Sequence, residues 1–257
     1  MFANYHTHTP RCHHATGAEE EYVRCAVDAG MQILGFSDHT PYPFADGFRS
    51  SFRMDIHELA DYTAKVLALR KQYAAQIAIG LGVEAEFYPK YFREMVSILQ
   101  DHGMEYMILG QHFLYNETEN IGSGGPTADS KLLEQYCNQT IDAMHTGLFS
   151  CFAHPDLMCF VGEDAIYRQQ IRRLCKAAKE CGIPLELNLL GLYLGRSYPD
   201  RRFWEIAAEE NCSVILGCDA HRPDFLLDTK LQQQGLALLE SLGLQPLQTL
   251  NLRPVKL

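Results

Sequence analysis

Residues 213–222 read Ser213-Val-Ile-Leu-Gly-Cys-Asp-Ala-His-Arg222. The first half of this stretch is β-branched and apolar, which is typical of a short buried strand. The strand ends by presenting Asp219 and His221, which are two residues apart and therefore lie on one side of an extended chain. The stretch thus predicts a buried strand with a carboxylate and an imidazole at its carboxyl end.

The beginning of the chain repeats this arrangement. Residues 2–8 read Phe2-Ala-Asn-Tyr-His-Thr-His8, a short strand that ends in His-x-His. Four further apolar segments also read as strands that lead to a histidine or a glutamate: 33–37 before His39, 77–83 before Glu84, 104–109 before His112 and 149–153 before His154. We expect all these side chains to converge on one metal centre.

Helical segments alternate with these strands. The apolar spacing predicts helices over 17–29, 54–73, 89–102, 130–146, 163–181 and 199–211, a sixth strand over 183–189, a helix in the tail after Asp224 and a terminal strand over 247–252. Two long loops, 40–53 and 116–129, separate them, and the first is long enough to be a lid or a specificity loop.

This alternation predicts an α/β fold with a parallel sheet. An open sheet gathers its site at one switch point, whereas polar residues follow nearly every strand of this chain. We therefore predict a barrel of about seven strands that occupies residues 1–257 as one domain.

Composition narrows the class of protein. The chain has 257 residues, 47% of them hydrophobic, and no apolar run approaches the roughly 20 residues of a membrane span. Its nine cysteines form no C-x-x-C pair, which favours reduced thiols in the cytoplasm. The net charge of −10 argues against a nucleic acid as the main partner. The oligomeric state stays open.

Nine side chains are candidate metal ligands. They are His6, His8, His14, His39, Glu84, His112, His154, Asp219 and His221. So many polar groups crowded on one face need cations as partners. Imidazoles and carboxylates without a thiolate suit zinc, manganese or iron, in two or three divalent ions. Only Glu84 and Asp219 offset that positive charge, which favours an anionic substrate such as a phosphate ester.

Four further polar residues are candidates for the same site, and three of them lie beside ligands in the sequence. Arg196 follows the sixth strand in an apolar, Gly-rich loop, where a guanidinium can clasp phosphate oxygens. Asp38, Glu86 and Asp156 are open to three roles: orienting a histidine, contacting a cationic group of the substrate, or capping a helix. We expect Glu86 to bind the substrate.

Other phosphatase chemistries lack their motifs. The sequence has no D-x-D motif, no Cys-x5-Arg loop, no Gly-x-Ser-x-Gly elbow and no Gly-x4-Gly-Lys-[Ser/Thr] loop. An amidohydrolase also begins with His-x-His on a barrel strand, but many need a lysine at a strand end, and the lysines of this chain lie elsewhere. A non-catalytic metal-binding protein is the remaining alternative.

The ordered motifs resemble the polymerase and histidinol phosphatase (PHP) superfamily. They are His6-Thr-His8, Asp38-His39, Glu84, His112, His154 and Asp219-Ala-His221. The stretches Gly35-Phe-Ser-Asp-His39, Gly82-Val-Glu-Ala-Glu86 and Gly195-Arg-Ser-Tyr-Pro199 look like the histidinol-phosphatase branch. The resemblance implies a distorted (β/α)7 barrel, similar to a TIM barrel, with a trinuclear metal centre.

The resemblance also implies an order among the ligands. His6, His8, Glu84 and Asp219 would hold one ion, and Glu84 would bridge to a second ion held with His112 and His154. His14, rather than His13, would join His39 and His221 at the third ion. Arg196 would match a phosphate-binding arginine. One departure is that the run after His154 lacks the second basic residue of the family's pattern.

We therefore expect a metal-dependent phosphomonoesterase that hydrolyses L-histidinol phosphate, a step of histidine biosynthesis, by attack of a metal-bound hydroxide. Arg196, Glu84, Asp219 and His221 would be its catalytic residues, and Arg196 and Glu86 would contact the substrate. The alternative within the enzymes is a phosphoesterase for another small ester, such as that of a sugar or a nucleotide.

Overall fold

The computed structural model describes residues 1–45 and 47–257, in which parallel strands alternate with helices as predicted. The strands are β1 (Ala3–Asn4), β2 (Ile33–His39), β3 (Ala78–Ala85), β4 (Tyr106–Leu109), β5 (Phe149–Phe152), β6 (Leu185–Asn188) and β7 (Val214–Gly217). The α-helices are α1 (Glu19–Asp28), α2 (Leu59–Gln72), α3 (Phe92–Asp101), α4 (Ser130–His145), α5 (Asp164–Glu180), α6 (Leu189–Leu194), α7 (Arg201–Glu209) and α8 (Thr229–Ser241). Short 3-10 helices are η1 (Pro10–Cys12), η2 (Ile56–Glu58), η3 (Glu117–Glu119) and η4 (Pro223–Leu227).

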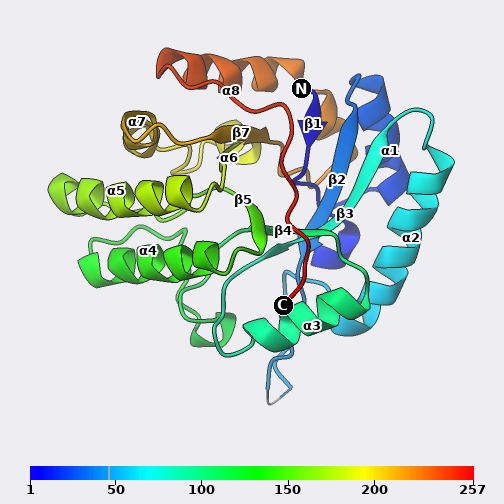
Figure 1. Cartoon of the computed structure of the whole chain (residues 1–257), viewed down its shortest axis with the longest axis horizontal. Coiled ribbons are helices and arrows are strands. Elements are labelled where there is room, and N and C mark those ends of the chain that lie inside the picture. Colours follow the sequence, from blue (N-terminus) through cyan, green and yellow to red (C-terminus); the bar gives the residue numbers. More distant parts are fainter. Residues whose placement is uncertain (46) are drawn as a thin grey trace.

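The strands form a nearly closed barrel. They pair in sequence order from β1 to β7, and Figure 1 shows the helices as a ring outside them. Just beyond β1 and β7, His8 N donates to Ala220 O at 2.9 Å and Ala220 N donates to His6 O at 3.2 Å. This link brings the His-x-His segment at the start of the chain beside Asp219 and His221.

The barrel interior is filled by a small apolar cluster that is separate from the main core. Tyr106, on β4, is fully buried in this cluster, and its hydroxyl lies 3.0 Å from Tyr5 O and 2.9 Å from Phe36 O. A Cβ atom at Gly82 of β3 would overlap the Tyr106 ring. The absence of a side chain at Gly82 therefore lets a large aromatic residue occupy the interior.

Two predicted strands differ from the structure. The first strand ends at Asn4, because the Asn4 side chain donates to His6 O at 3.0 Å and to Thr7 Oγ1 at 2.8 Å and so bends the chain. The predicted terminal strand, 247–252, is wrong. Its first residue still lies beside β7, where Leu247 N donates to Val214 O at 2.7 Å. The segment then leaves β7, with Leu250 buried in the interior cluster, and Figure 1 shows it crossing the middle of the ring.

The predicted loop after β6 also begins differently. Residues Leu189–Leu194 form α6, because the Asn188 side chain accepts a hydrogen bond from Gly191 N at 2.8 Å and caps the helix. Gly195, in the left-handed region at φ 60°, ends the helix just before Arg196.

The main hydrophobic core lies between the barrel and its helices. It contains residues from Tyr22 to Val255, so we infer that residues 1–257 form one domain. In the part of the chain that the structure describes, no helix combines the length and the apolar composition needed to cross a membrane.

Candidate metal centre

The carboxyl ends of the strands bring all nine predicted ligands together. Seven of them line a cavity of about 440 Å³: His14, His39, Glu84, His112, His154, Asp219 and His221. The other two, His6 and His8, are fully buried and lie within 3.5 Å of carboxylate oxygens of Glu84 and Asp219. Residues that are more than 200 positions apart in the sequence therefore share one site.

The first group of potential ligand atoms lies deepest. His6 Nε2 and His8 Nε2 are 3.1 Å apart, and they lie 3.4 Å and 3.2 Å from Asp219 Oδ1. Glu84 Oε2 is 3.4 Å from His6 Nε2 and 3.5 Å from His8 Nε2. Four ligand atoms from the carboxyl ends of three strands, β1, β3 and β7, thus lie close together.

The hydrogen bonds on the far sides of these two rings explain why a cation fits there. His6 Nδ1 lies 2.9 Å from Glu186 Oε2, and His8 Nδ1 lies 3.3 Å from Asp38 Oδ1. Carboxylates only accept hydrogen bonds, so each Nδ1 carries the proton and each Nε2 presents a lone pair. Asp219 Oδ1 and Glu84 Oε2 are buried acceptors without a donor. Four lone-pair-bearing atoms that face one another, two nitrogens and two oxygens, are suitable ligands for a divalent ion such as zinc.

A second group forms on the other side of the Glu84 carboxylate. Glu84 Oε1 lies 2.8 Å from His154 Nε2 and 3.6 Å from His112 Nε2. His112 Nδ1 lies 3.1 Å from Glu86 Oε1, which again leaves Nε2 as the acceptor that faces the cavity. Because its two oxygens face different groups, Glu84 is placed to bridge two ions.

The third group consists of His14, His39 and His221. Backbone carbonyls take the Nδ1 protons of two of them, since His14 Nδ1 lies 2.6 Å from Cys12 O and His221 Nδ1 lies 3.0 Å from Asp219 O. Their Nε2 lone pairs therefore face each other at 2.9 Å. His14 belongs to this group, as the resemblance implies, whereas His13 belongs to none of the groups found among the described residues.

Electrostatics keeps the two carboxyl groups ionised. Burial alone would raise the pKa of Glu84, but the surrounding imidazoles, His112 first among them, outweigh it and hold this pKa well below its usual value. The pKa of Asp219 is lowered in the same way against its burial, chiefly by His6 and His221. Burial lowers the pKa of His39 well below its usual value and favours the neutral ring. Anionic carboxylates and a neutral imidazole are the forms that bind metal.

The backbone is strained at two of the nine positions. His154 has φ 33° and Asp219 has φ 54°, a left-handed conformation that residues other than glycine adopt at a cost of about 1–3 kcal/mol. Each residue lies two positions after the carboxyl end of its strand, β5 or β7. Both side chains line the cavity.

The structure adds two residues that sequence reasoning missed. Glu186 lies in β6, is 2% exposed and accepts from His6 Nδ1. Asn188 donates to Glu186 Oε1 at 2.8 Å and to Asp219 Oδ2 at 3.1 Å. The only sequence signal was a glutamate and an asparagine in an otherwise apolar strand segment.

Of the three acids whose role the sequence left open, Asp38 contacts a candidate ligand and Asp156 does not. Asp38 accepts from the His8 ring and from Thr9 N at 3.2 Å. Asp156 accepts from Asp200 N at 2.7 Å and from Trp204 Nε1 at 2.9 Å, so it supports the start of α7 instead of facing the cavity.

The expectation that Glu86 contacts the substrate is not supported by its position. Glu86 is fully buried, does not line the cavity, and directs both carboxylate oxygens at Arg53. One of these oxygens also faces His112. Since both oxygens are engaged inside the protein, neither is free to meet a cationic group of a substrate.

Arg196 lies at the edge of the cavity, as predicted. Its Nη1 donates to Tyr198 Oη at 2.6 Å, and the Tyr198 ring is centred 5.9 Å from the His154 ring. Within residues 1–45 and 47–257, Arg196 forms no ion pair with a carboxylate, and it is the only lysine or arginine that lines this cavity. The guanidinium is therefore available to an anion beside the three groups of ligand atoms.

Comparisons with known proteins agree with this geometry. The sequence model of the PHP domain matches residues 4–189, more than half of the chain. A probable histidinol-phosphatase from Deinococcus radiodurans is 30% identical over 227 residues, which cover 85% of each chain. The histidinol-phosphatase of Bacillus subtilis is 23% identical over 248 residues, 84% of this chain and 92% of the relative.

A solved structure supports the same fold. The crystal structure of histidinol phosphate phosphatase from Lactococcus lactis subsp. lactis, in complex with zinc, L-histidinol and phosphate, matches with a TM-score of 0.72 and 16% identity over 95% of each chain. At this identity the likeness establishes the barrel fold. Together with the match of the domain model and the 30% identical relative, it shows that this chain belongs to the PHP domain family.

Proposed function

We propose that this protein is a metal-dependent phosphomonoesterase that hydrolyses L-histidinol phosphate to L-histidinol and phosphate. The observation that carries the proposal is the position of Glu84, whose two carboxylate oxygens face different groups of imidazoles, in a cavity that Arg196 also lines. The names of the two sequence relatives supply the substrate. The nine unpaired cysteines support a cytoplasmic location.

Three ions would be held by side chains in the groups described above. His6, His8, Glu84 and Asp219 would hold the first, Glu84, His112 and His154 the second, and His14, His39 and His221 the third. Zinc, manganese or iron suits these nitrogen and oxygen donors. When bound, such ions make a coordinated water more acidic and neutralise charge on phosphoryl oxygens.

The chain's own residues bind and orient. Arg196 would clasp two phosphoryl oxygens, and its bond to Tyr198 would hold the guanidinium at the cavity edge. The Asp219 carbonyl fixes the proton of His221 on Nδ1, so that His221 Nε2 stays an acceptor. Glu84 and Asp219 are the only acids that line the cavity in the part of the chain that the structure describes. Because both would be engaged by the ions, an ammonium group of the substrate would meet other polar groups of the cavity.

The first test is phosphate release from L-histidinol phosphate by the purified protein, together with the metal content per chain. We expect release with two or three ions bound, loss of release after dialysis against a strong chelator, and recovery when zinc or manganese is returned. A substrate panel of sugar and nucleotide monophosphates serves as the comparison. If the protein binds metal but releases phosphate only from another ester, it is a metal-dependent phosphatase whose substrate is not L-histidinol phosphate. Full activity without metal would contradict the proposal.

The role of Arg196 predicts a second result. Arg196→Met should raise KM for the ester and the inhibition constant of inorganic phosphate by about ten- to a hundredfold, because a charge-assisted hydrogen bond contributes about 1.5–3 kcal/mol. Arg196→Lys should recover only part of this, since lysine lacks the planar fork. Arg201→Met, which removes an exposed arginine paired with Glu205 on α7, is the matched control. Equal effects of the Arg196 and Arg201 changes would contradict a phosphate contact.

A further inference from the structure

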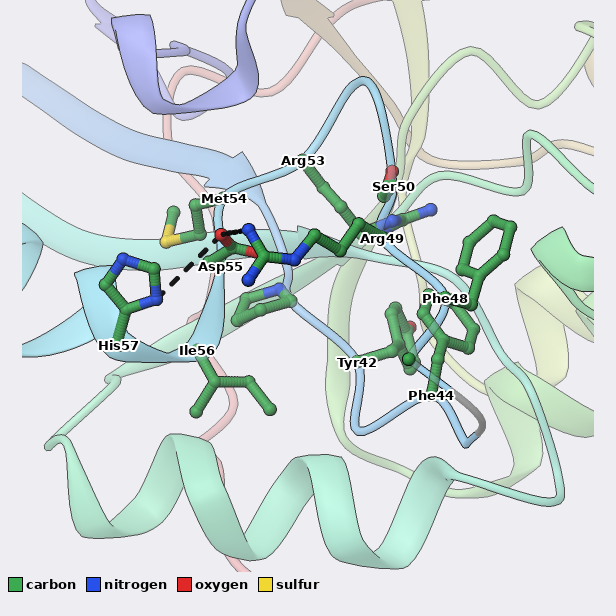
Figure 2. A pocket seen from close by; sticks show the side chains of 12 residues that line it. Tyr42, Phe44, Phe48, Arg49, Ser50, Arg53, Met54, Asp55, Ile56 and His57 are labelled. Carbon is green, nitrogen blue, oxygen red and sulfur yellow. Dashed lines mark ion pairs between the residues drawn. The ribbon is translucent and has the colours of Figure 1, made fainter.

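Arg53 is a buried arginine at the end of the segment 40–53, between β2 and η2. Only 2% of its surface is exposed. Figure 2 shows Arg53 where this segment ends, with Tyr42, Phe44 and Phe48 of the same segment around a cavity of about 450 Å³. A charge this deeply buried must be paired and hydrogen-bonded to be tolerated.

The partners of Arg53 come from two other segments and from the start of its own. Its Nη1 and Nη2 donate to the two carboxylate oxygens of Glu86, each at 2.9 Å, and its Nε donates to Glu117 Oε2 at 2.8 Å. Nη1 also donates to Thr40 O at 3.0 Å, which ties together the two ends of the segment 40–53. Glu86 and Glu117 are buried as well, with 0% and 6% exposure.

Glu86 connects this arginine to the candidate metal centre. The oxygen that accepts from Arg53 Nη2 is the same Oε1 atom that lies 3.1 Å from His112 Nδ1. Two parallel hydrogen bonds from one guanidinium fix both the position and the plane of the carboxylate. The direction in which His112 presents Nε2 to Glu84 therefore depends on how Arg53 holds Glu86.

A second contact acts in the same direction. The Arg53 guanidinium carbon lies 4.3 Å from the centre of the Phe52 ring. That ring is centred 5.1 Å from the His39 ring and 5.8 Å from the His112 ring, and it lines the metal cavity. Arg53 thus supports His112 through Glu86 on one side and through Phe52 on the other.

We propose that Arg53 is a positioning residue of the metal centre, which fixes Glu86 and Phe52 so that His112 keeps the orientation needed to bind an ion with Glu84 and His154. The proposal rests on the proposed metal role of His112. Arg53 itself touches neither the ions nor the substrate. Its guanidinium fork is required, because a lysine at this position can donate to one Glu86 oxygen but cannot define the plane of the carboxylate.

The experiment compares metal retention in the wild type and in Arg53→Lys, with a chelator competing for the ions of the loaded protein. Loss of a residue that orients a metal-binding histidine typically weakens metal affinity about 10- to 100-fold. We expect a loss of this size for one ion per chain, with the remaining ions retained as in the wild type. The matched control is Glu117→Gln, which removes the other acidic partner of Arg53 and leaves the contact of Glu86 with His112 in place.

A double variant keeps the test usable if Arg53→Lys alone fails to fold. In Arg53→Lys/Glu117→Gln, residue 117 carries no buried charge that would lack the guanidinium as a partner. The comparison with Glu117→Gln therefore isolates the contact between Arg53 and Glu86. Selective loss of one ion in the double variant, but not in Glu117→Gln, supports the proposal. Equal metal retention in both variants, or an equal loss of all ions in both, overturns it.

The role of Arg53 can be tested independently of the proposed phosphatase activity. Metal retention requires no substrate, so a protein that binds its ions but leaves L-histidinol phosphate intact still tests the role of Arg53. A second measurement is a double-mutant cycle of metal affinity that combines Arg53→Lys with Glu86→Gln. If Arg53 acts through Glu86, the losses in metal affinity from the two changes should not add. Additive losses would overturn the action of Arg53 through Glu86.

Discussion

Replacement of Glu84 by alanine should lower kcat/KM for the phosphate ester by at least about a thousandfold and reduce the bound metal to one ion or fewer per chain. The reason is that Glu84 belongs to two of the three groups of candidate ligands and contacts His39 of the third. Its Oε2 atom lies 3.1 Å from His39 Nδ1 as well as close to His6 and His8, and its Oε1 atom lies 2.8 Å from His154 Nε2. Metal content and initial rates, measured on the same preparation, check this result.

Glu84→Gln is the control for shape. The amide keeps the volume of the carboxylate but carries no charge and replaces one acceptor with a donor that faces imidazole nitrogens. We therefore expect it to resemble Glu84→Ala in metal content while unfolding at a temperature close to that of the metal-free wild type. A Glu84→Gln protein that retains its ions and its activity would show that Glu84 does not bridge them.

Replacement of Gly110 by alanine should have an effect almost as large. Gly110 directly follows β4, and a Cβ atom there would overlap Oε1 of Glu84 on the neighbouring strand β3. The added methyl group must push the Glu84 carboxylate away from its position, and a displacement of about 1 Å can cost about a hundredfold in rate. We expect at least this loss of kcat/KM, with fewer ions bound, in a protein that still folds.

Gly122→Ala is the matched control for this change. Gly122 lies in the loop after β4, and the nearest atom to its added Cβ would be His112 O at 4.0 Å, which is an ordinary contact. Its activity and metal content should equal those of the wild type. If Gly110→Ala were as active as the wild type, the carboxylate of Glu84 would tolerate displacement, and the proposed bridging geometry would be wrong.

Much of the fold and of the candidate site is readable from the sequence because it depends on local order. A short apolar run forms a strand wherever it is buried, and residues 33–37 and 213–217 appear in the structure nearly as predicted. In a parallel barrel every strand ends at the same face, so a histidine or carboxylate after each strand must lie near the others. Strand order then places His6 beside Asp219 without any knowledge of the side-chain contacts.

Other features of the site depend on contacts that no sequence spacing encodes. Glu86 looked like a substrate contact because it is two residues from Glu84, but Arg53 lies 33 positions away and occupies its carboxylate. Glu186 looked like an ordinary strand residue, although it holds the His6 ring from 180 positions away. The segment 247–252 had the composition of a strand, yet it meets β7 only at Leu247, beside Val214, and Leu250 is then buried in the interior cluster.

Residue type and order along the chain were enough to predict the alternation of strands and helices, the face that carries the nine candidate ligands and the family resemblance. Tertiary structure alone decided which nitrogen of each histidine faces the cavity, which acids orient rings and which arginine remains free for an anion. These depend on partners that folding brings together from distant segments, and a buried polar group takes its role from whichever partner meets it there.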